Sequence, residues 1–277
     1  MSKLTVTLID VGWGDSILLE SIDSNNTSHF GLIDSNDTTY ERSSFIYLKK
    51  YFDRKSLLYS GNNHIFDFIM LSHAHSDHGQ GLKGVLKEFG TKNFWYPKSL
   101  SWSSMVYLIN YANRYQKFVD VHQSVDDTKI LPNFGKVIMK VLWPRYGDSI
   151  DTKNENNNSI VLTLQLDEVV FILTVDAEAE VWQQISSLIP PNTKLFKVPH
   201  HGSVNGTFDN NNTPWLDQCP SDTVFPISSH IKPFKHPHQK VIDELDSRNK
   251  KYFRTDQQYH LTFETDGTSI NTKYSHY

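Results

Sequence analysis

The stretch FDFIMLSHAHSDHG, residues 66–79, decides the fold. It begins with apolar residues typical of a buried strand and ends in His73, His75, Asp77 and His78. Because side chains alternate along a strand, His73 and His75 project to the same side of an extended backbone. The chain must then turn, which brings Asp77 and His78 to a second point nearby. Imidazole nitrogens and carboxylate oxygens bind zinc, manganese and iron, so the spacing predicts two adjacent metal positions.

Other strand-like segments also end in residues that bind metals. One leads to Asp34, an apolar run leads to Asp176, and a short strand leads to His200. We expect these strand ends to converge on one rim of a structure built from two sheets. The alternative is a solvated, histidine-rich loop, or histidines satisfied in a core. The position at strand ends, where α/β sheets place their sites, favours metal binding.

Hydrophobic periodicity predicts strands and helices along the whole chain, which indicates the α/β (α+β) class. The expected helices are 43–55, 79–89, 103–117, 177–188 and 238–248. The expected strands are 3–10, 16–20, 29–35, 66–71, 93–96, 118–122, 136–144, 159–166, 169–175, 194–198, 223–228, 251–255, 259–264 and 269–274. No low-complexity linker separates the two halves, so residues 1–277 are expected to form a single domain.

The composition is ordinary for a soluble globular protein, with 38% hydrophobic and 21% charged residues. The single cysteine, Cys219, cannot form an internal disulfide and is expected to be a small buried residue. No segment resembles a signal peptide or reaches the ~20 apolar residues of a membrane helix, so a cytoplasmic protein without a membrane span is expected. The net charge of −4 argues against a general nucleic-acid coating protein. It leaves room for a local basic groove.

Eight ordered segments resemble a known family. The string HAHSDH resembles the signature of the metallo-β-lactamase fold, a four-layer αββα sandwich with a one- or two-metal site between its sheets. The wider set is similar to the C-terminal hydrolase domain of ComEC-type competence DNA-uptake channels and its free-standing relatives. Its members are DVGWGDS (10–16), GLIDS (31–35), LSHAHSDHGQG (71–81), NNNSIVL (156–162), LTVDAE (173–178), KVPHHGS (197–203), KHPHQKVIDEL (235–245) and YFRTD (252–256). The resemblance implies a stand-alone hydrolase.

The resemblance implies metal ligands in two groups that share a carboxylate. They are His73 and His75 for the first metal, Asp77, His78 and His200 for the second, and Asp176 as the bridge. His201 is the less favoured claimant for the position given to His200. Asp34 resembles the carboxylate that orients a ligating imidazole through its other nitrogen.

The chain departs from the family pattern at the first metal site. Within 79–175 the only histidine is His122, in a strand-like segment that does not match. The sequence NNNS stands where a third histidine is usual, so Asn158 or a neighbour is expected to donate an amide oxygen or contact substrate. Fewer imidazoles shift the preference from zinc toward manganese. Trp13 replaces a usual glutamine at the mouth of the site, and Val175 replaces a usual glycine, which is expected to alter packing only.

These residues predict a hydrolase that uses one or two divalent ions, zinc or manganese. Such ions lower the pKa of a bridging water to about 7, which gives a hydroxide nucleophile. The first hypothesis is a phosphodiesterase, in particular a nuclease, acting on nucleic acid or nucleotides. Asp77 is expected to position the hydroxide, and His236 to protonate the leaving group or bind phosphate. Asn158 and Ser203 are candidates to donate to phosphate oxygens, and Trp13 to stack on a base.

Several alternatives stay open. His236 can be a surface histidine before Pro237, Ser203 and Asn158 can cap loops, and Trp13 can be structural. A second hypothesis is hydrolysis of a small ester, lactone, lactam or thioester by the same metal hydroxide, which the acidic net charge favours. A third is a non-catalytic metal-binding accessory module, which the weakened first site favours.

Overall fold

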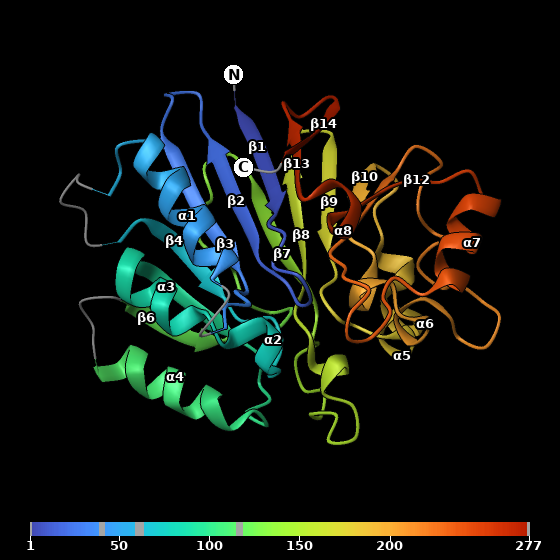
Figure 1. Ribbon diagram of the computed structural model, residues 1–277, viewed down its shortest axis with the longest axis horizontal. Coiled ribbons are helices and arrows are strands. Elements are labelled where there is room, and N and C mark those ends of the chain that lie inside the picture. Colours follow the sequence, from blue (N-terminus) through green and yellow to red (C-terminus); the bar gives the residue numbers. More distant parts are fainter. Residues whose placement is uncertain (1, 39–41, 59–63, 115–118, 276–277) are drawn as a thin grey trace.

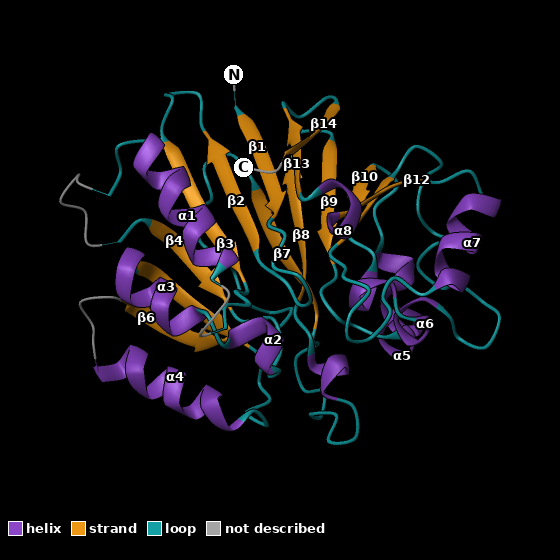
Figure 2. Cartoon of the chain, in the orientation of Figure 1, coloured by secondary structure: helices purple, strands orange, loops and turns teal. Residues whose placement is uncertain are grey.

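The strands of the computed structural model form two sheets that lie face to face between outer helices (Figures 1 and 2). The structure describes residues 2–38, 42–58, 64–114 and 119–275. The first sheet has eight strands in the order β14-β13-β1-β2-β3-β4-β5-β6, and the second has six in the order β12-β11-β10-β9-β8-β7.

Each sheet is antiparallel in one part and parallel in the other. The first comprises β1 (Lys3–Leu8), β2 (Ile17–Ile22), β3 (Ser28–Ile33), β4 (Phe66–Met70), β5 (Thr91–Tyr96), β6 (Val119–Ser124), β13 (His260–Thr265) and β14 (Ile270–Ser275). The second comprises β7 (Ile138–Trp143), β8 (Val161–Leu166), β9 (Val169–Leu173), β10 (Thr193–Phe196), β11 (Val224–Ile227) and β12 (Lys251–Arg254). Strands β3 to β6 are parallel, as are β9 to β12. Parallel strands place their carboxyl ends at one edge, where ligand sites commonly form.

The helices cover the outer faces of both sheets (Figure 1). On the first sheet lie α1 (Ser43–Arg54), α3 (Leu82–Phe89) and α4 (Ser103–Arg114). On the second lie α5 (Ala179–Ile185), α6 (Val204–Thr207) and α7 (Gln239–Ser247). Short helices in the connections are α2 (Ser76–Gly79), α8 (Thr255–Gln258), and the 3-10 turns η1 (Glu155–Asn158), η2 (Ser186–Leu188) and η3 (Pro199–Gly202).

Three separate apolar layers hold this arrangement together. Strand β9 shows why, because it is apolar on both faces and contributes to two of them. Its Phe171 and Leu173 pack between the sheets, while Val170 and Ile172 pack against the outer helices. A third layer, which includes Phe52, lies between the first sheet and α1, α3 and α4. Three buried layers require four layers of secondary structure, so the predicted αββα architecture is confirmed.

Three predicted helices differ in extent from the observed ones. The helix expected over 177–188 is observed as α5 followed by the 3-10 turn η2. The helix expected over 79–89 is divided into α2 and α3, because the backbone turns at Gly81 and packs against the first sheet. A Cβ at Gly81 would lie 2.8 Å from the carbonyl oxygen of Ser35. The helix expected over 103–117 is observed to Arg114, and its last three positions lie outside the described residues. In the described part of the chain, no helix combines the length and apolar character needed to cross a membrane.

The turn after β1 supplies a test of this packing. Gly14 has φ 90° and Gly12 has φ 76°, and this left-handed region costs other residues about 1–2 kcal/mol. A Cβ at Gly14 would also lie 2.2 Å from the carbonyl oxygen of Asp77, whereas a Cβ at Gly12 has no atom within 4 Å. We therefore expect Gly14→Ala to lower the free energy of unfolding, measured in urea, more than Gly12→Ala does. Equal losses would contradict the close approach to Asp77.

Candidate metal site

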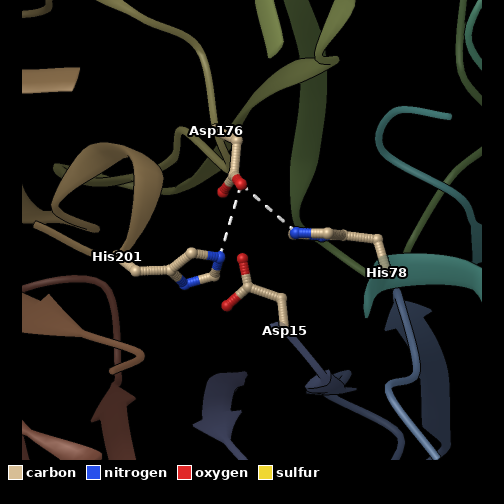
Figure 3. Close-up of side chains that lie close together, drawn as sticks. All are labelled: Asp15, His78, Asp176 and His201. Carbon is tan, nitrogen blue, oxygen red and sulfur yellow. Dashed lines mark ion pairs between the residues drawn. The ribbon is translucent and has the colours of Figure 1, made fainter. Parts of the chain in front are cut away.

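Four buried side chains converge where the two sheets meet. Asp15, His78, Asp176 and His201 each offer one ligand atom, and these atoms all lie within 4.8 Å of one another (Figure 3). Asp176 Oδ2 lies 3.3 Å from His78 Nε2 and 3.3 Å from His201 Nε2. Asp15 and His78 come from connections of the first sheet, and Asp176 and His201 from connections of the second. We call these four residues the central cluster.

The polar atoms of the central cluster fit a cation. His78 Nε2, His201 Nε2, Asp176 Oδ1 and both carboxylate oxygens of Asp15 are buried and make no hydrogen bond with a described residue. Asp15 Oδ2 does lie 2.9 Å from the buried ammonium of Lys197. Buried polar atoms without partners destabilise a fold, so several of them facing one point are suited to bind a cation. Two carboxylates and two imidazoles are suitable donors for a divalent transition metal.

Carboxylates and imidazoles of the central cluster stabilise each other's charged forms. Burial alone would lower the pKa of His78, but the carboxylates of Asp176 and Asp34 hold that pKa well above its ordinary value. Burial alone would raise the pKa of Asp176, but the imidazoles of His201 and His78 hold it well below its ordinary value. The Asp176 carboxylate is therefore ionised and able to bind a cation.

Asp34 fixes the orientation of His78. Its Oδ2 lies 2.7 Å from His78 Nδ1 and accepts a hydrogen bond of 2.6 Å from Ser72 Oγ, while its Oδ1 accepts one of 2.7 Å from Ser72 N. With Nδ1 held by this carboxylate, His78 directs Nε2 toward Asp176. Asp34 thus occupies the place that an orienting carboxylate requires.

The histidines assigned to the first metal lie together beside the central cluster. His73 is fully buried, and its Nε2 is 3.0 Å from His75 Nδ1 and 3.9 Å from Asp176 Oδ2. The rings of His73 and His78 have centroids 4.2 Å apart. Asp77 is half-buried, with Oδ2 3.7 Å from His78 Nε2. All four motif residues therefore surround the region next to Asp176.

Of the two neighbouring histidines 200 and 201, the structure places His201 in the central cluster. The Nδ1–H of His201 donates to the carbonyl oxygen of Ser228 at 2.9 Å, and this contact turns Nε2 toward Asp176 Oδ2, 3.3 Å away. His200 instead has Nδ1 2.8 Å from Glu178 Oε1, and its Nε2 is 3.9 Å from Asp176 Oδ2. The resemblance favoured His200, whereas this geometry favours His201.

Asp15 is the residue of the central cluster to which the sequence analysis gave no role. It lies inside DVGWGDS, one of the segments that resemble the ComEC-type hydrolase domain. A carboxylate in a glycine-rich turn directly after a strand was the available signal, since Asp34 and Asp176 also follow strands. Its buried partner Lys197 had no signal, because lysine is rarely fully buried.

A cavity of about 510 Å³ opens onto the site. Its lining comprises Trp13, His75, Ser76, Asp77, Asn156, Asp176, His200, His201, His230, Phe234 and His236. The rings of Trp13 and Phe234 meet edge to face at 5.5 Å and form an aromatic wall.

His236, which lines this cavity, has a lowered pKa of about 4. Burial is the largest cause, followed by the charges of His201 and His200. His236 is therefore neutral at pH 7, which fits binding of phosphate better than protonation of a leaving group.

Two predicted substrate residues are engaged elsewhere. The amide of Asn158 accepts a hydrogen bond from the backbone N–H of Asp151 at 2.8 Å and donates to its carbonyl at 2.9 Å. Ser203 Oγ accepts from Gly206 N at 2.9 Å and caps α6. Neither lies among the residues that line the cavity. Asn158 and Ser203 therefore make the contacts expected of the alternative, in which they cap loops.

Asn156, rather than Asn158, reaches the cavity. Its Nδ2 donates to Glu178 Oε1 at 2.9 Å, and its Oδ1 is buried without a hydrogen-bond partner among the described residues. Glu178 also contacts His200, so one carboxylate positions both side chains. His122 Nδ1 lies 3.2 Å from the hydroxyl of Tyr96 on β5 and is not part of the cavity lining. An amide oxygen of Asn156, and not of Asn158, is therefore available beside the cavity.

Val175 affects the backbone conformation as well as the packing that the sequence predicted. It adopts φ 49°, the left-handed region that glycine occupies freely and that β-branched residues disfavour. Its carbonyl oxygen accepts a hydrogen bond of 2.9 Å from the backbone of His200. The substitution of the usual glycine therefore strains the backbone directly before Asp176.

The orientation of His78 can be tested with Asp34→Asn. Asn tolerates the φ of 60° at this position, so the variant removes the charge and keeps the backbone. Loss of such an orienting carboxylate typically weakens metal binding about 10–100-fold. Calorimetric titration of manganese and zinc into metal-free protein measures the change. Asp67→Asn is the control, because Asp67 also holds an imidazole, that of His29 at 3.1 Å, but away from the site; equal affinities in both variants would contradict the assignment.

The adjacent histidines allow a second test. Because His201 faces Asp176 and His200 is held by Glu178, we expect His201→Ala to lose more bound metal than His200→Ala. Metal content is measured by elemental analysis after dialysis against a fixed free concentration of manganese. Greater loss from His200→Ala would restore the assignment favoured by the sequence.

Comparison with known proteins agrees with this architecture. No family model matches the chain. Over 193 residues it is 28% identical to ComE operon protein 3 of Bacillus subtilis (strain 168), and this match covers 69% of the chain but only 24% of the relative. A metallo-β-lactamase fold protein from Bacillus subtilis, YhfI, superposes with a TM-score of 0.57 at 10% identity, covering 96% of this chain and 100% of that one.

A long form RNase Z from yeast gives a TM-score of 0.45 at 12% identity, over 82% of this chain and 37% of that one. Similarity to solved structures at such identities concerns the fold alone, and the YhfI match is the one that carries it. The sequence match supports the resemblance to ComEC-type proteins over part of their length. The chain has the metallo-β-lactamase fold.

Proposed function

We propose that this protein is a metal-dependent phosphodiesterase, in particular a nuclease. The convergence of two buried carboxylates and two imidazoles, whose ligand atoms lie within 4.8 Å of one another beside an open cavity, carries the proposal. The sequence similarity to ComE operon protein 3, together with the resemblance to the hydrolase domain of DNA-uptake channels, favours a phosphodiester over a lactam. Nucleic acid or nucleotides are the proposed substrates.

The residues proposed to hold the metals form two groups around Asp176. They are Asp15, His78 and His201 for one ion, with Asp77 and His200 at its margin, and His73, His75 and the amide oxygen of Asn156 for the other. Both groups use oxygen as well as nitrogen donors. This mixture favours manganese over zinc, since thiolate and imidazole sites suit zinc better.

A bound divalent ion supplies Lewis acidity and makes a water molecule nucleophilic near neutral pH. The protein positions the reactants. The half-buried carboxylate of Asp77 faces the cavity and accepts a hydrogen bond from the attacking water, which orients it. The neutral ring of His236 donates N–H to a phosphoryl oxygen. The wall formed by Trp13 and Phe234 offers an aromatic surface to a base.

Lys197 balances the charge that these carboxylates accumulate. It is fully buried, and its ammonium lies 2.9 Å from Asp15 Oδ2. Burial alone would raise the pKa of Asp15, but the ammonium of Lys197, with the imidazoles of His201 and His78, holds that pKa below its ordinary value, so Asp15 is ionised. We propose that Lys197 keeps Asp15 ionised within the central cluster, where its carboxylate can bind a cation.

A substrate panel tests the function. Protein freed of metal with a chelator and reloaded with manganese or zinc is assayed on single-stranded DNA, RNA and a chromogenic phosphodiester. A lactam and a lactone are assayed in parallel. We expect phosphodiester cleavage only with metal, and a loss of more than about 100-fold in His78→Ala and Asp176→Ala, since even outer partners of ligands typically contribute 10–100-fold.

Each contrary outcome identifies one of the alternatives. Turnover of the lactam or lactone alone would establish the small-molecule hydrolase. The acidic net charge favours this alternative. Uptake of manganese or zinc with no turnover of any substrate would establish a non-catalytic metal-binding accessory module, and failure to take up either metal would contradict the metal site itself. The control variant Asp67→Asn should behave as the unaltered protein throughout.

A further inference from the structure

A second cavity, of about 280 Å³, lies where α1 passes the start of β13. The side chains that give it chemical character are two cations, three aromatic or imidazole rings and one carboxylate. They are Lys50, Arg54, Tyr47, Tyr259, His260 and Asp10. None of them belongs to the lining of the cavity over the metal site.

The cations favour an anionic ligand. Lys50 and Arg54 are one helical turn apart on α1, so they lie on the same face of the helix, and both are exposed to solvent. The carboxylate of Asp10 opposes them only in part. Its Oδ1 accepts a hydrogen bond from Gly12 N at 3.1 Å, and burial raises its pKa. Among the residues that line the cavity, two are cationic and one, Asp10, is acidic.

The rings favour a flat, aromatic partner. Tyr47 and His260 meet edge to face at 4.6 Å, and His260 Nδ1 accepts a hydrogen bond from Asp10 N at 3.0 Å, which fixes the imidazole. Tyr259 stays 43% exposed, although its backbone has φ 62° and ψ −131°. Such a conformation costs a non-glycine residue about 1–3 kcal/mol and persists only where the surroundings hold it. Tyr259 is exposed, whereas Tyr47 and His260 are half-buried. Aromatic rings beside cations are typical of subsites for single-stranded nucleic acid.

The second cavity adjoins the metal site. Asp10 lines the second cavity and Trp13 lines the first, and three residues of chain span at most about 11 Å. His230 of the first cavity also lies close enough to Asp10 to act on its charge. A single nucleic-acid strand that crosses the turn at residues 10–14 can therefore occupy both cavities.

Building on the proposed phosphodiesterase function, we propose that the second cavity binds a nucleotide of the same substrate strand, beyond the one that is cleaved. Lys50 and Arg54 contact its phosphates, and Tyr47 and Tyr259 contact its base. The substrate class is then a single-stranded polynucleotide, not a mononucleotide or a small phosphodiester.

Charge removal tests the subsite. The variant Lys50→Ala/Arg54→Ala is compared with Lys49→Ala/Lys87→Ala, which loses the same charge from α1 and α3 outside the cavity. With manganese present, kcat/KM is measured for a twelve-nucleotide single-stranded DNA and for a chromogenic phosphodiester. We expect the preference for the DNA to fall about 10-fold or more only in the first variant. Its salt dependence should also become shallower, by about 1.4 in the slope of log(kcat/KM) against log[salt], because two phosphate contacts are lost.

The outcomes separate the subsite from the function on which it rests. An unchanged preference, or an equal loss in both variants, would overturn the subsite and leave the phosphodiesterase in place. No cleavage of either substrate by the unaltered protein would overturn the phosphodiesterase and the subsite with it. A free mononucleotide that binds through Lys50 and Arg54 without raising the KM for the DNA would also overturn the subsite, because the ligand would then be a separate nucleotide.

Discussion

The buried carboxylate of Asp176 is the constraint on which the site depends. An ionised carboxylate that is 2% exposed is costly unless it is paired, and Asp176 is paired by His78 and His201 at 3.3 Å each. One imidazole comes from a connection of the first sheet and the other from a connection of the second. The same charge therefore joins the ends of both sheets and creates the point where a cation fits.

Much of the fold could be predicted because its signals are local. A strand such as β9, apolar at every position from Val169 to Leu173, must be covered on both faces, which already requires a layered structure. The motif from His73 to His78 likewise lies at a strand end, where the structure places it. Convergence of distant strand ends also follows from topology, since the parallel strands of each sheet end on the same edge. These inferences depend on periodicity and order along the chain.

The details of the site depend on backbone conformation, which the sequence does not display. His200 and His201 are adjacent, and only their left-handed φ values of 46° and 56° decide which ring faces Asp176. Similarly, the 3-10 turn η1 directs Asn156 to the cavity and ties Asn158 into the loop. Asp15 was missed because a single aspartate in a turn has many ordinary explanations. Its place in the central cluster becomes visible only beside its spatial neighbours.

Strained backbone conformations at the rim of the candidate site are held by hydrogen bonds. Asp34, Val175, His200 and His201 all have positive φ, and none is glycine. Residues in such conformations persist only where other interactions determine them, and here hydrogen bonds do so. His200 N donates to the carbonyl of Val175 at 2.9 Å, and Asp34 N donates to that of Met70 at 2.8 Å. The strands thus hold the candidate ligand residues in place. Such preorganisation is what a site needs to stabilise charge that develops during a reaction.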